Sequence, residues 1–271
     1  MAVHPTAIVE EGASLGSAVE IGPFCSVSAG AVLADGVKLV SHVVILGHTE
    51  IGTKTIVYPN AVLGGPAQTH GEILADARLV IGANNIVREG VTISAGSRVG
   101  GGITRVGDAN YLMAYSHIGH DCQVGSNVTL SNGVQLGGHV EIGDRVILGG
   151  LAAVQQFSRV GQGAFISGLS GVSTDVIPYG IAIGLHVRLG GLNLIGLRRR
   201  NVPRQDIHAA RAAYRMIFLE QGSIHDNAER AAAKWPDVAQ VREITDFILA
   251  PAKRPICPAR KRGAHDADEE A

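Results

Sequence analysis

Aliphatic residues recur at every sixth position through most of the first two thirds of the chain. One run covers residues 9–63 without a miss, and a second begins at Ile81 and ends at Val99. After a slip of one residue the same spacing covers residues 106–172. Neither an α-helix nor an ordinary strand has a period of six, whereas a hexapeptide-repeat β-helix has. The pattern therefore predicts a mainly β protein, a parallel β-helix in which three hexapeptides close one coil of about 18 residues.

The interior of such a coil is narrow, and the composition agrees with this. Hydrophobic residues make up 46% of the chain but aromatic residues only 4%, because each face holds one small aliphatic side chain. Glycines often follow the repeat aliphatic directly, as at Gly22 and Gly143, where we expect the backbone to turn a corner sharply. Cys25 and Cys122 occupy a position of the repeat that usually holds a small residue, so we expect both to be buried thiols.

The repeat is broken once and then ends. Residues 64–80 interrupt it and are expected to project as a loop, a frequent place for functional residues. After residue 172 helical signals follow, in which Asn201 ahead of Pro203 is expected to cap one helix and Ser223 to cap a second. The predicted domains are a β-helix over residues 1–190, a small helical domain over 191–250 and a disordered tail over 251–271, which is proline-rich and then charged.

Charge and cysteine content restrict the function. The formal net charge of −1 gives no electrostatic reason to expect binding to nucleic acid. Three cysteines argue against a disulfide framework. The chain shows neither a secretory signal nor an apolar run long enough to form a transmembrane segment. We therefore expect a soluble, cytoplasmic protein.

The repeat period places chemically active residues together without a structure. Residues 18 apart in the unbroken stretch lie above one another on the same edge. One such column contains His120, Gly138 and Gln156. The next contains Asp121, His139 and Phe157. Two histidines, a carboxylate and a glycine therefore lie close together. A histidine can act as a general base, and a glycine leaves its amide open as an oxyanion donor. Solvated polar residues, or a zinc site of His117, His120 and His139, are the alternatives.

The two columns also carry a family resemblance. One stretch reads His117-Ile118-Gly119-His120-Asp121-Cys122, and the next coil reads Gly137-Gly138-His139-Val140. Together they resemble the UDP-N-acetylglucosamine O-acyltransferase family of lipid A biosynthesis. Further stretches are similar to that family at residues 3–9, 100–104 and 193–200. The resemblance covers the repeats and the first helix, up to about residue 220.

The resemblance implies a left-handed parallel β-helix with a C-terminal helical domain, assembled as a homotrimer. It also implies transfer of an (R)-3-hydroxyacyl chain from acyl carrier protein to the 3-hydroxyl of UDP-N-acetylglucosamine, the first step of lipid A biosynthesis. No cofactor is implied, because the acyl group arrives on the phosphopantetheine arm of the carrier.

By position, His120 resembles the family's general base, Asp121 its supporting carboxylate and Gly138 its oxyanion-hole amide. Gly168 resembles the residue that gauges acyl length, and a glycine there predicts a long chain. The positions that resemble substrate contacts are His117, His139, Gln156, Gln68, Asn193, Arg199 and Arg200, of which the two arginines suit phosphate groups.

Several positions differ from the family pattern. Charged or basic groups that the family uses to hold substrate are replaced here by Thr69, Gly71, Ser94, Ala95, Gln155 and Ile195. These changes leave open a divergent acyltransferase that acts on another acceptor, such as a 3-amino sugar nucleotide. A zinc-binding or purely structural trimeric hexapeptide protein is the alternative from another class.

Overall fold

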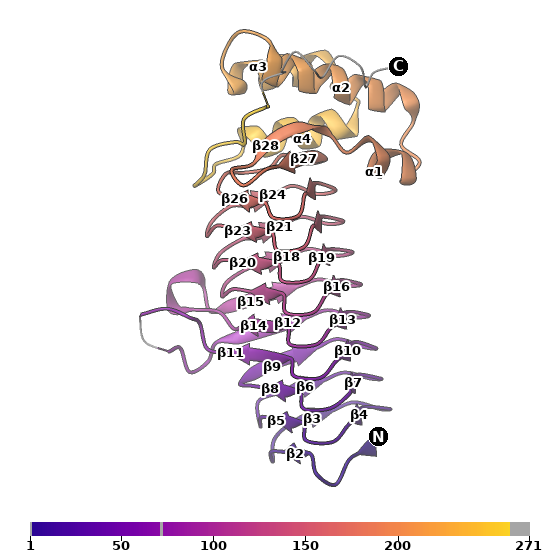
Figure 1. Cartoon of the computed structure of the whole chain (residues 1–271), viewed down its shortest axis with the longest axis vertical. Helices are drawn as coiled ribbons and strands as arrows, with labels where there is room; N and C mark the ends of the chain where they lie inside the picture. Colours follow the sequence, from indigo (N-terminus) through magenta and orange to yellow (C-terminus); the bar gives the residue numbers. More distant parts are fainter. Residues whose placement is uncertain (1, 71–72, 261–271) are drawn as a thin grey trace.

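The computed structural model of the chain describes residues 2–70 and 73–260. Its main body is a tall triangular prism made of three sheets, and a small group of helices covers one end (Figure 1). Within the described residues the sheets have 11, 9 and 8 strands, and we call them sheets A, B and C. All their neighbouring strands run parallel except the last pair of sheet A. The predicted parallel β-helix is confirmed.

The strands of the three sheets follow one another around the prism. Sheet A contains β1 (Ala2–Val3), β4 (Glu20–Ile21), β7 (Lys38–Leu39), β10 (Ile56–Val57), β13 (Ile86–Val87), β16 (Tyr111–Leu112), β19 (Thr129–Leu130), β22 (Ile147–Leu148), β25 (Phe165–Ile166), β27 (Gly180–Ile183) and β28 (Arg188–Leu192). Sheet B contains β2 (Ile8–Val9), β5 (Ser26–Val27), β8 (Val44–Ile45), β11 (Val62–Gly65), β14 (Thr92–Ser94), β17 (His117–Ile118), β20 (Gln135–Leu136), β23 (Ala153–Val154) and β26 (Gly171–Val172). Sheet C contains β3 (Ser14–Leu15), β6 (Val32–Leu33), β9 (His48–Ile51), β12 (Arg78–Ile81), β15 (Ile103–Val106), β18 (Gln123–Val124), β21 (Glu141–Ile142) and β24 (Arg159–Val160).

The repeat aliphatics point into the prism, as the period predicts. Leu33, Ile118 and Leu148 are each at most 1% exposed, and Cys25 and Cys122 are buried free thiols beside them. Burial raises the pKa of Cys122 to about 12, so this thiol stays protonated and unreactive. The core is a single column of stacked aliphatic side chains from the lowest coil to the helical end.

Glycine is required after the repeat aliphatic for a different reason than the one expected from the sequence. Their φ angles are not positive; the left-handed corner position lies two residues further on, as at Phe24 (φ 57°) and Arg145 (φ 58°). A Cβ built on Gly22 would lie 1.7 Å from the Val40 carbonyl oxygen, and one on Gly143 would lie 2.5 Å from the Gln162 nitrogen. Glycine is needed here because the next coil passes so close, and not for the turn itself.

Two excursions leave the prism at the corner between sheets B and C. The separation of stacked residues is 18 in the regular coils, but it widens to 30 around the first excursion and to 25 around the second. The first, between β11 and β12, is the loop expected from the broken repeat, and it projects to the left of the prism in Figure 1. The second, between β14 and β15, contains a short 3-10 helix, Arg98–Gly100.

Val99 was expected to point inward as the last beat of its run, and this was wrong. It lies in the 3-10 helix and is 91% exposed. The slip of one residue in the sequence pattern is in fact an inserted loop, whose length happens to be close to one hexapeptide.

Up to residue 260, where the description ends, four α-helices follow the prism: α1 (Leu194–Arg199), α2 (Arg204–Leu219), α3 (Ile224–Lys234) and α4 (Ala239–Leu249). Ser223 caps α3, as predicted, by accepting a hydrogen bond from the Asp226 amide. Asn201 does not cap α2, whose N-cap is Pro203 without a side-chain bond; instead Asn201 adopts a left-handed φ of 57° in the link between α1 and α2. No helix among the described residues combines the length and the apolar surface needed to cross a membrane.

The first part of the expected disordered tail is ordered. Residues 251–260 return from α4 to the top of the prism, where Ile256 forms a parallel bridge with Asp175 and Ala259 one with Leu189. The side chain of Cys257 is fully buried beneath this segment. Composition suggested disorder, but backbone pairing and one buried side chain fix the path. Residues 261–271 lie outside the described residues.

Candidate active site

The two predicted columns meet at the corner between sheets B and C. Asp121, His139 and Phe157 occupy the left-handed corner position of three successive coils, with φ angles of 60°, 58° and 65°. Each lies directly after the residue of the other column, His120, Gly138 and Gln156. The left-handed conformation turns these side chains out of the prism and stacks them one coil apart. We call this group the catalytic corner.

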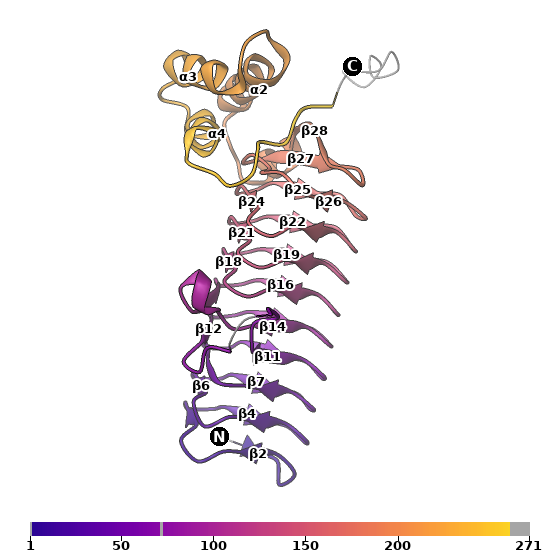
Figure 2. The same ribbon diagram turned by 90° about the vertical axis from the view of Figure 1, so that its left-hand side faces the viewer.

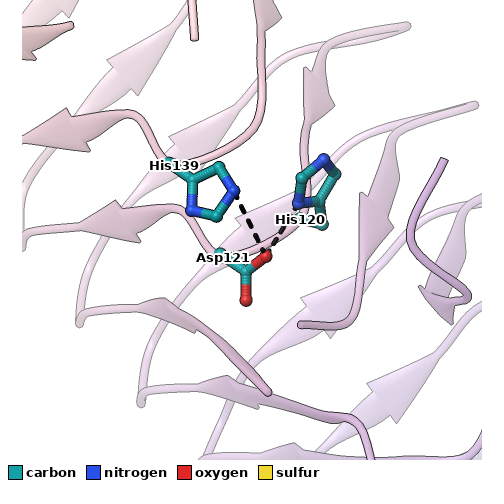
Figure 3. A group of neighbouring side chains, drawn as sticks. All are labelled: His120, Asp121 and His139. Carbon is teal, nitrogen blue, oxygen red and sulfur yellow. Dashed lines mark hydrogen bonds and ion pairs between the residues drawn. The ribbon is translucent and has the colours of Figure 1, made fainter. Parts of the chain in front are cut away.

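His120 and Asp121 form a buried pair in this corner. The His120 Nδ1 lies 2.7 Å from Asp121 Oδ2, and the two side chains are 8% and 1% exposed. Figure 3 shows the carboxylate pointing between the two imidazole rings of His120 and His139. With Nδ1–H donating to the carboxylate, Nε2 is the nitrogen of His120 that is left to accept a proton.

Asp121 is itself held by residues of the second excursion and its neighbouring strand. The Ser97 amide donates to Oδ1 at 2.8 Å, and the Ser97 hydroxyl donates to Oδ2 at 2.6 Å. The Asp121 amide donates to Thr104 Oγ1 at 2.8 Å. These bonds fix the orientation of the carboxylate. Sequence reasoning missed Ser97, because the inserted loop hid its position in the stack.

Gly138 lies against the reactive edge of His120. A Cβ built on Gly138 would come within 2.5 Å of both Cε1 and Nε2 of the His120 ring, so only glycine leaves the ring in place. Within the described part of the chain, the Gly138 amide donates no hydrogen bond to the protein. The stacking expected from the period therefore places an unengaged N–H beside the His120 ring; its role as an oxyanion donor stays a prediction.

The other two histidines border this pair. His139 Nε2 lies 3.8 Å from Asp121 Oδ2, and its ring meets that of His120 edge to face at a centroid distance of 5.0 Å. His117, on β17, has its Nδ1 2.7 Å from Thr92 Oγ1. Burial lowers the pKa of both His117 and His139, so both are neutral near pH 7 and can act as hydrogen-bonding groups.

The geometry does not favour the zinc site considered from the sequence. His120, Asp121 and His139 do have potential ligand atoms within 4.8 Å of one another, but His117 is bonded to Thr92 and is not part of that group. His120 Nδ1 and both oxygens of Asp121 are already engaged in the hydrogen bonds described above. This network is typical of a base oriented by a carboxylate.

The remaining expected site residues lie in several different parts of the chain. Gln156 lies one coil above Gly138 in the same column, and Gln68 lies in the first excursion, at the same corner. Gly168 lies at a different corner, between β25 of sheet A and β26 of sheet B.

Asn193, Arg199 and Arg200 belong to α1 or its cap, beyond the end of sheet A. The Asn193 side chain caps α1 through Gly196, and Arg200 lies over the Tyr179 ring at 4.7 Å. The structure therefore does not bring these three residues or Gly168 to His120 within one chain.

The positions that differ from the family pattern lie at the same corner or on α1. Ser94 and Ala95 are buried at the start of the second excursion, each 4% exposed. Thr69 and Gln155 are exposed, and Ile195 on α1 is 62% exposed. Gly71 lies outside the described residues.

Two family models match parts of the chain. Residues 175–257 match a domain described as "Udp N-acetylglucosamine O-acyltransferase; Domain 2". Residues 103–138, which include His120 and Gly138, match the six-repeat bacterial transferase hexapeptide family.

Similar proteins match over nearly the whole length. A protein of Sinorhizobium fredii named acyl-[acyl-carrier-protein]--UDP-N-acetylglucosamine O-acyltransferase is 47% identical over 96% of this chain and 97% of its own. One of Brucella ovis with the same name is 46% identical over 99% and 98%. The solved UDP-N-acetylglucosamine acyltransferase of Campylobacter jejuni superposes with a TM-score of 0.90 at 37% identity, over 95% of this chain and all of that one. The Moraxella catarrhalis enzyme gives 0.92 at 34% identity, over 94% and 99%.

Proposed function

Because this chain belongs to the UDP-N-acetylglucosamine O-acyltransferase family, we propose that its catalytic corner is the site of acyl transfer, with His120 as the general base. The protein is a left-handed parallel β-helix with a small helical end. Its reaction moves a hydroxyacyl chain from acyl carrier protein to UDP-N-acetylglucosamine in lipid A biosynthesis. The near-full-length relatives support this reaction over a divergent acceptor, a zinc protein or a purely structural solenoid.

In the proposed mechanism His120 Nε2 takes the proton of the sugar 3-hydroxyl as that oxygen attacks the thioester carbonyl of an (R)-3-hydroxyacyl donor. Asp121, which accepts the Nδ1–H bond, stabilises the imidazolium that forms. The Gly138 amide donates to the oxyanion of the tetrahedral intermediate. When the intermediate collapses, the carbon–sulfur bond breaks, and the imidazolium gives its proton to the departing thiolate of the carrier, which leaves as the thiol.

One observation carries this assignment: the Nε2 of a histidine oriented by a buried carboxylate lies beside an amide that donates to no group among the described residues. His117, His139, Gln156 and Gln68, from the same corner or the loop below it, are proposed to contact substrate. No cofactor is needed, since the acyl group arrives on the carrier's phosphopantetheine arm, and we expect dialysis against a chelator to leave the turnover unchanged.

The test is to compare His120→Ala with the unmodified protein. Loss of a positioned base is expected to lower kcat by about 10²–10⁴-fold, while the melting temperature stays close to that of the parent. Turnover is measured with hydroxyacyl carrier protein and UDP-N-acetylglucosamine. Near-normal turnover in the variant would remove His120 from this role.

We also propose that the protein acts as a homotrimer with its sites between chains. His120 and Gly168, which are expected to touch the same acyl chain, lie at different corners of one prism and are separated by sheet B. A second copy that brings its A–B corner to the catalytic corner would unite them. Gly168 would then gauge acyl length, and Asn193, Arg199 and Arg200 would reach the donor arm or the nucleotide from the neighbouring chain.

The surface of the A–B corner supports such an assembly. Tyr115, Leu151 and Leu169 project from it and are 72%, 64% and 62% exposed, and Ile86 and Ile147 add apolar surface on the adjoining sheet A. A continuous apolar ridge of this kind is typical of a surface that is covered by another chain. Light scattering is expected to give three times the 28.1 kDa of one chain. The mass of a single chain would contradict the proposal.

A cytoplasmic location is proposed as well. The three cysteines are all buried and none forms a disulfide, as is usual in a reducing compartment. Fractionation of cells is expected to recover the activity with the cytoplasmic enzymes.

A further inference from the structure

The segment after α4 passes directly over the catalytic corner. Figure 2 shows it, in yellow, dropping from α4 to the top of the prism and crossing it before the chain ends. Beyond the crossing it is fixed by Asp175, whose amide donates to the Pro255 carbonyl at 2.8 Å and whose carbonyl accepts from the Cys257 amide at 2.8 Å. Residues 251–254, which we call the strap, are therefore held between α4 and this pairing.

Within the strap, Lys253 completes a stack of side chains that ends at His120. Its Nζ lies 4.2 Å from the centroid of the Phe157 ring. The other face of Phe157 lies against His139, with the rings 12° from parallel and their centroids 4.5 Å apart. His139 in turn meets His120 edge to face. The next strap residue, Arg254, donates from Nε to the Gln156 carbonyl at 3.1 Å, which holds the strap to the same coil.

The strap also closes one side of a cavity that opens onto the catalytic carboxylate. Pro251, Ala252 and Lys253 line this space of about 520 Å³ together with Asp121 and His139. The strap therefore lies next to the reacting groups although it is remote from them in sequence.

From this arrangement we propose that Lys253 is a positioning residue for the catalytic corner: through Phe157 it holds the His139 ring beside Asp121, and so leaves that carboxylate to serve His120. The inference rests on the proposed acyl transfer at His120. A cation over the face of an aromatic ring is attracted to that ring and so restrains it. With Lys253 on one side and His139 on the other, the Phe157 ring is held in place against His139.

The position and charge of His139 matter because Asp121 Oδ2 already has two donors, Ser97 Oγ and His120 Nδ1. A protonated His139, now 3.8 Å away, would compete for the same oxygen. The charged groups around His139 are Asp121 and His120 below it, Lys253 on the strap, and Glu141 and Arg159, which line the same cavity. Burial is the main cause of the lowered pKa of His139, and the His120 and Lys253 charges lower it further, whereas Asp121 raises it.

The test is the pH profile of kcat/KM for Lys253→Met, which keeps the side-chain stem and removes the charge. Without the cation the pKa of His139 rises, so His139 becomes protonated at a higher pH. We expect the acid limb of the profile to move to higher pH, with kcat/KM on that limb falling roughly 3-fold. Lys253→Arg retains a cation over the ring and is expected to restore the parent profile. In a Phe157→Leu background, Lys253→Met should have a smaller effect, because only the direct effect of the charge on His139 remains.

Lys234→Met is the matched control, because Lys234 also lies over a ring, that of Trp235, but on α3; its profile should equal that of the parent. An unmoved acid limb in Lys253→Met would overturn the inference, as would a Lys253→Arg variant that behaves like Lys253→Met. A rise in KM for the nucleotide sugar or for the carrier at every pH, with the acid limb in place, would also overturn it and indicate direct phosphate binding. Failure of His120 as the base is recognised separately, by activity that persists in His120→Ala.

Discussion

Replacing Gly138 by alanine adds one methyl group at the reactive edge of His120. The backbone of Gly138 does not have a positive φ, so alanine can adopt it without strain. The obstacle is the His120 ring, whose Cε1 and Nε2 would both lie 2.5 Å from the new Cβ. Such contacts are about 1 Å shorter than ordinary van der Waals contacts between heavy atoms. Because the next coil fixes the backbone, the imidazole is the group that moves.

The expected loss of activity follows from the contacts that the movement of the His120 ring disturbs. Shifting the ring by about 1 Å strains or breaks the 2.7 Å bond from His120 Nδ1 to Asp121 and misplaces the base, which costs on the order of 10² in rate. The methyl group also crowds the path to the Gly138 amide, so the expected loss in kcat/KM is about 10²–10³-fold. Overpacking of this kind destabilises a fold by about 1–3 kcal/mol.

Steady-state assays with both substrates, together with thermal melting, test this reasoning. Gly150→Ala is a stability control, because the nearest atom to its Cβ is a carbonyl oxygen at 3.5 Å. Combining Gly138→Ala with His120→Ala removes the clash with the ring, so the double variant should regain the lost stability. Any loss of turnover relative to His120→Ala then measures the crowding of the Gly138 amide alone. Turnover of Gly138→Ala within about 3-fold of the parent would refute the argument, as would an equal loss of stability in the His120→Ala background.

Three further changes test other parts of the structure. Ser97→Ala removes one of two bonds from this residue to Asp121 and should lower kcat/KM about 10-fold without changing the oligomer, as measured by steady-state kinetics. Asp175→Ala leaves the guanidinium of Arg159 without its buried partner at 2.7 Å, and should cost about 3–5 kcal/mol of unfolding free energy in urea titrations. Gly168→Met should shift the preference towards shorter acyl donors in competition assays, and an unchanged ranking would reject a role in chain-length selection.

The sequence predicted the part of the site that obeys the period. His120 and Gly138 are 18 apart in an unbroken stretch, so their stacking follows from the period alone. Ser97 escaped notice because an inserted loop separates it from Asp121, and a count of hexapeptides no longer places it. Lys253 was assigned to a tail whose composition suggests disorder. Its packing on Phe157 places it at the site, and composition could not predict that contact. Periodicity thus locates residues on the coils, but contacts made by inserted or returning segments depend on tertiary packing.

In the described part of the chain, helices and the strap cover the top of the prism. At the bottom Ile8 is 65% exposed, and no described strand pairs below the lowest coil. In a stack where each coil is stabilised by its two neighbours, thermal fraying starts where one neighbour is missing. Amide hydrogen exchange should therefore be fastest in the lowest rung and slow down towards the middle of the ladder. The rungs that carry His120 and Gly138 lie well inside the ladder, so opening of the amino-terminal end leaves their geometry undisturbed.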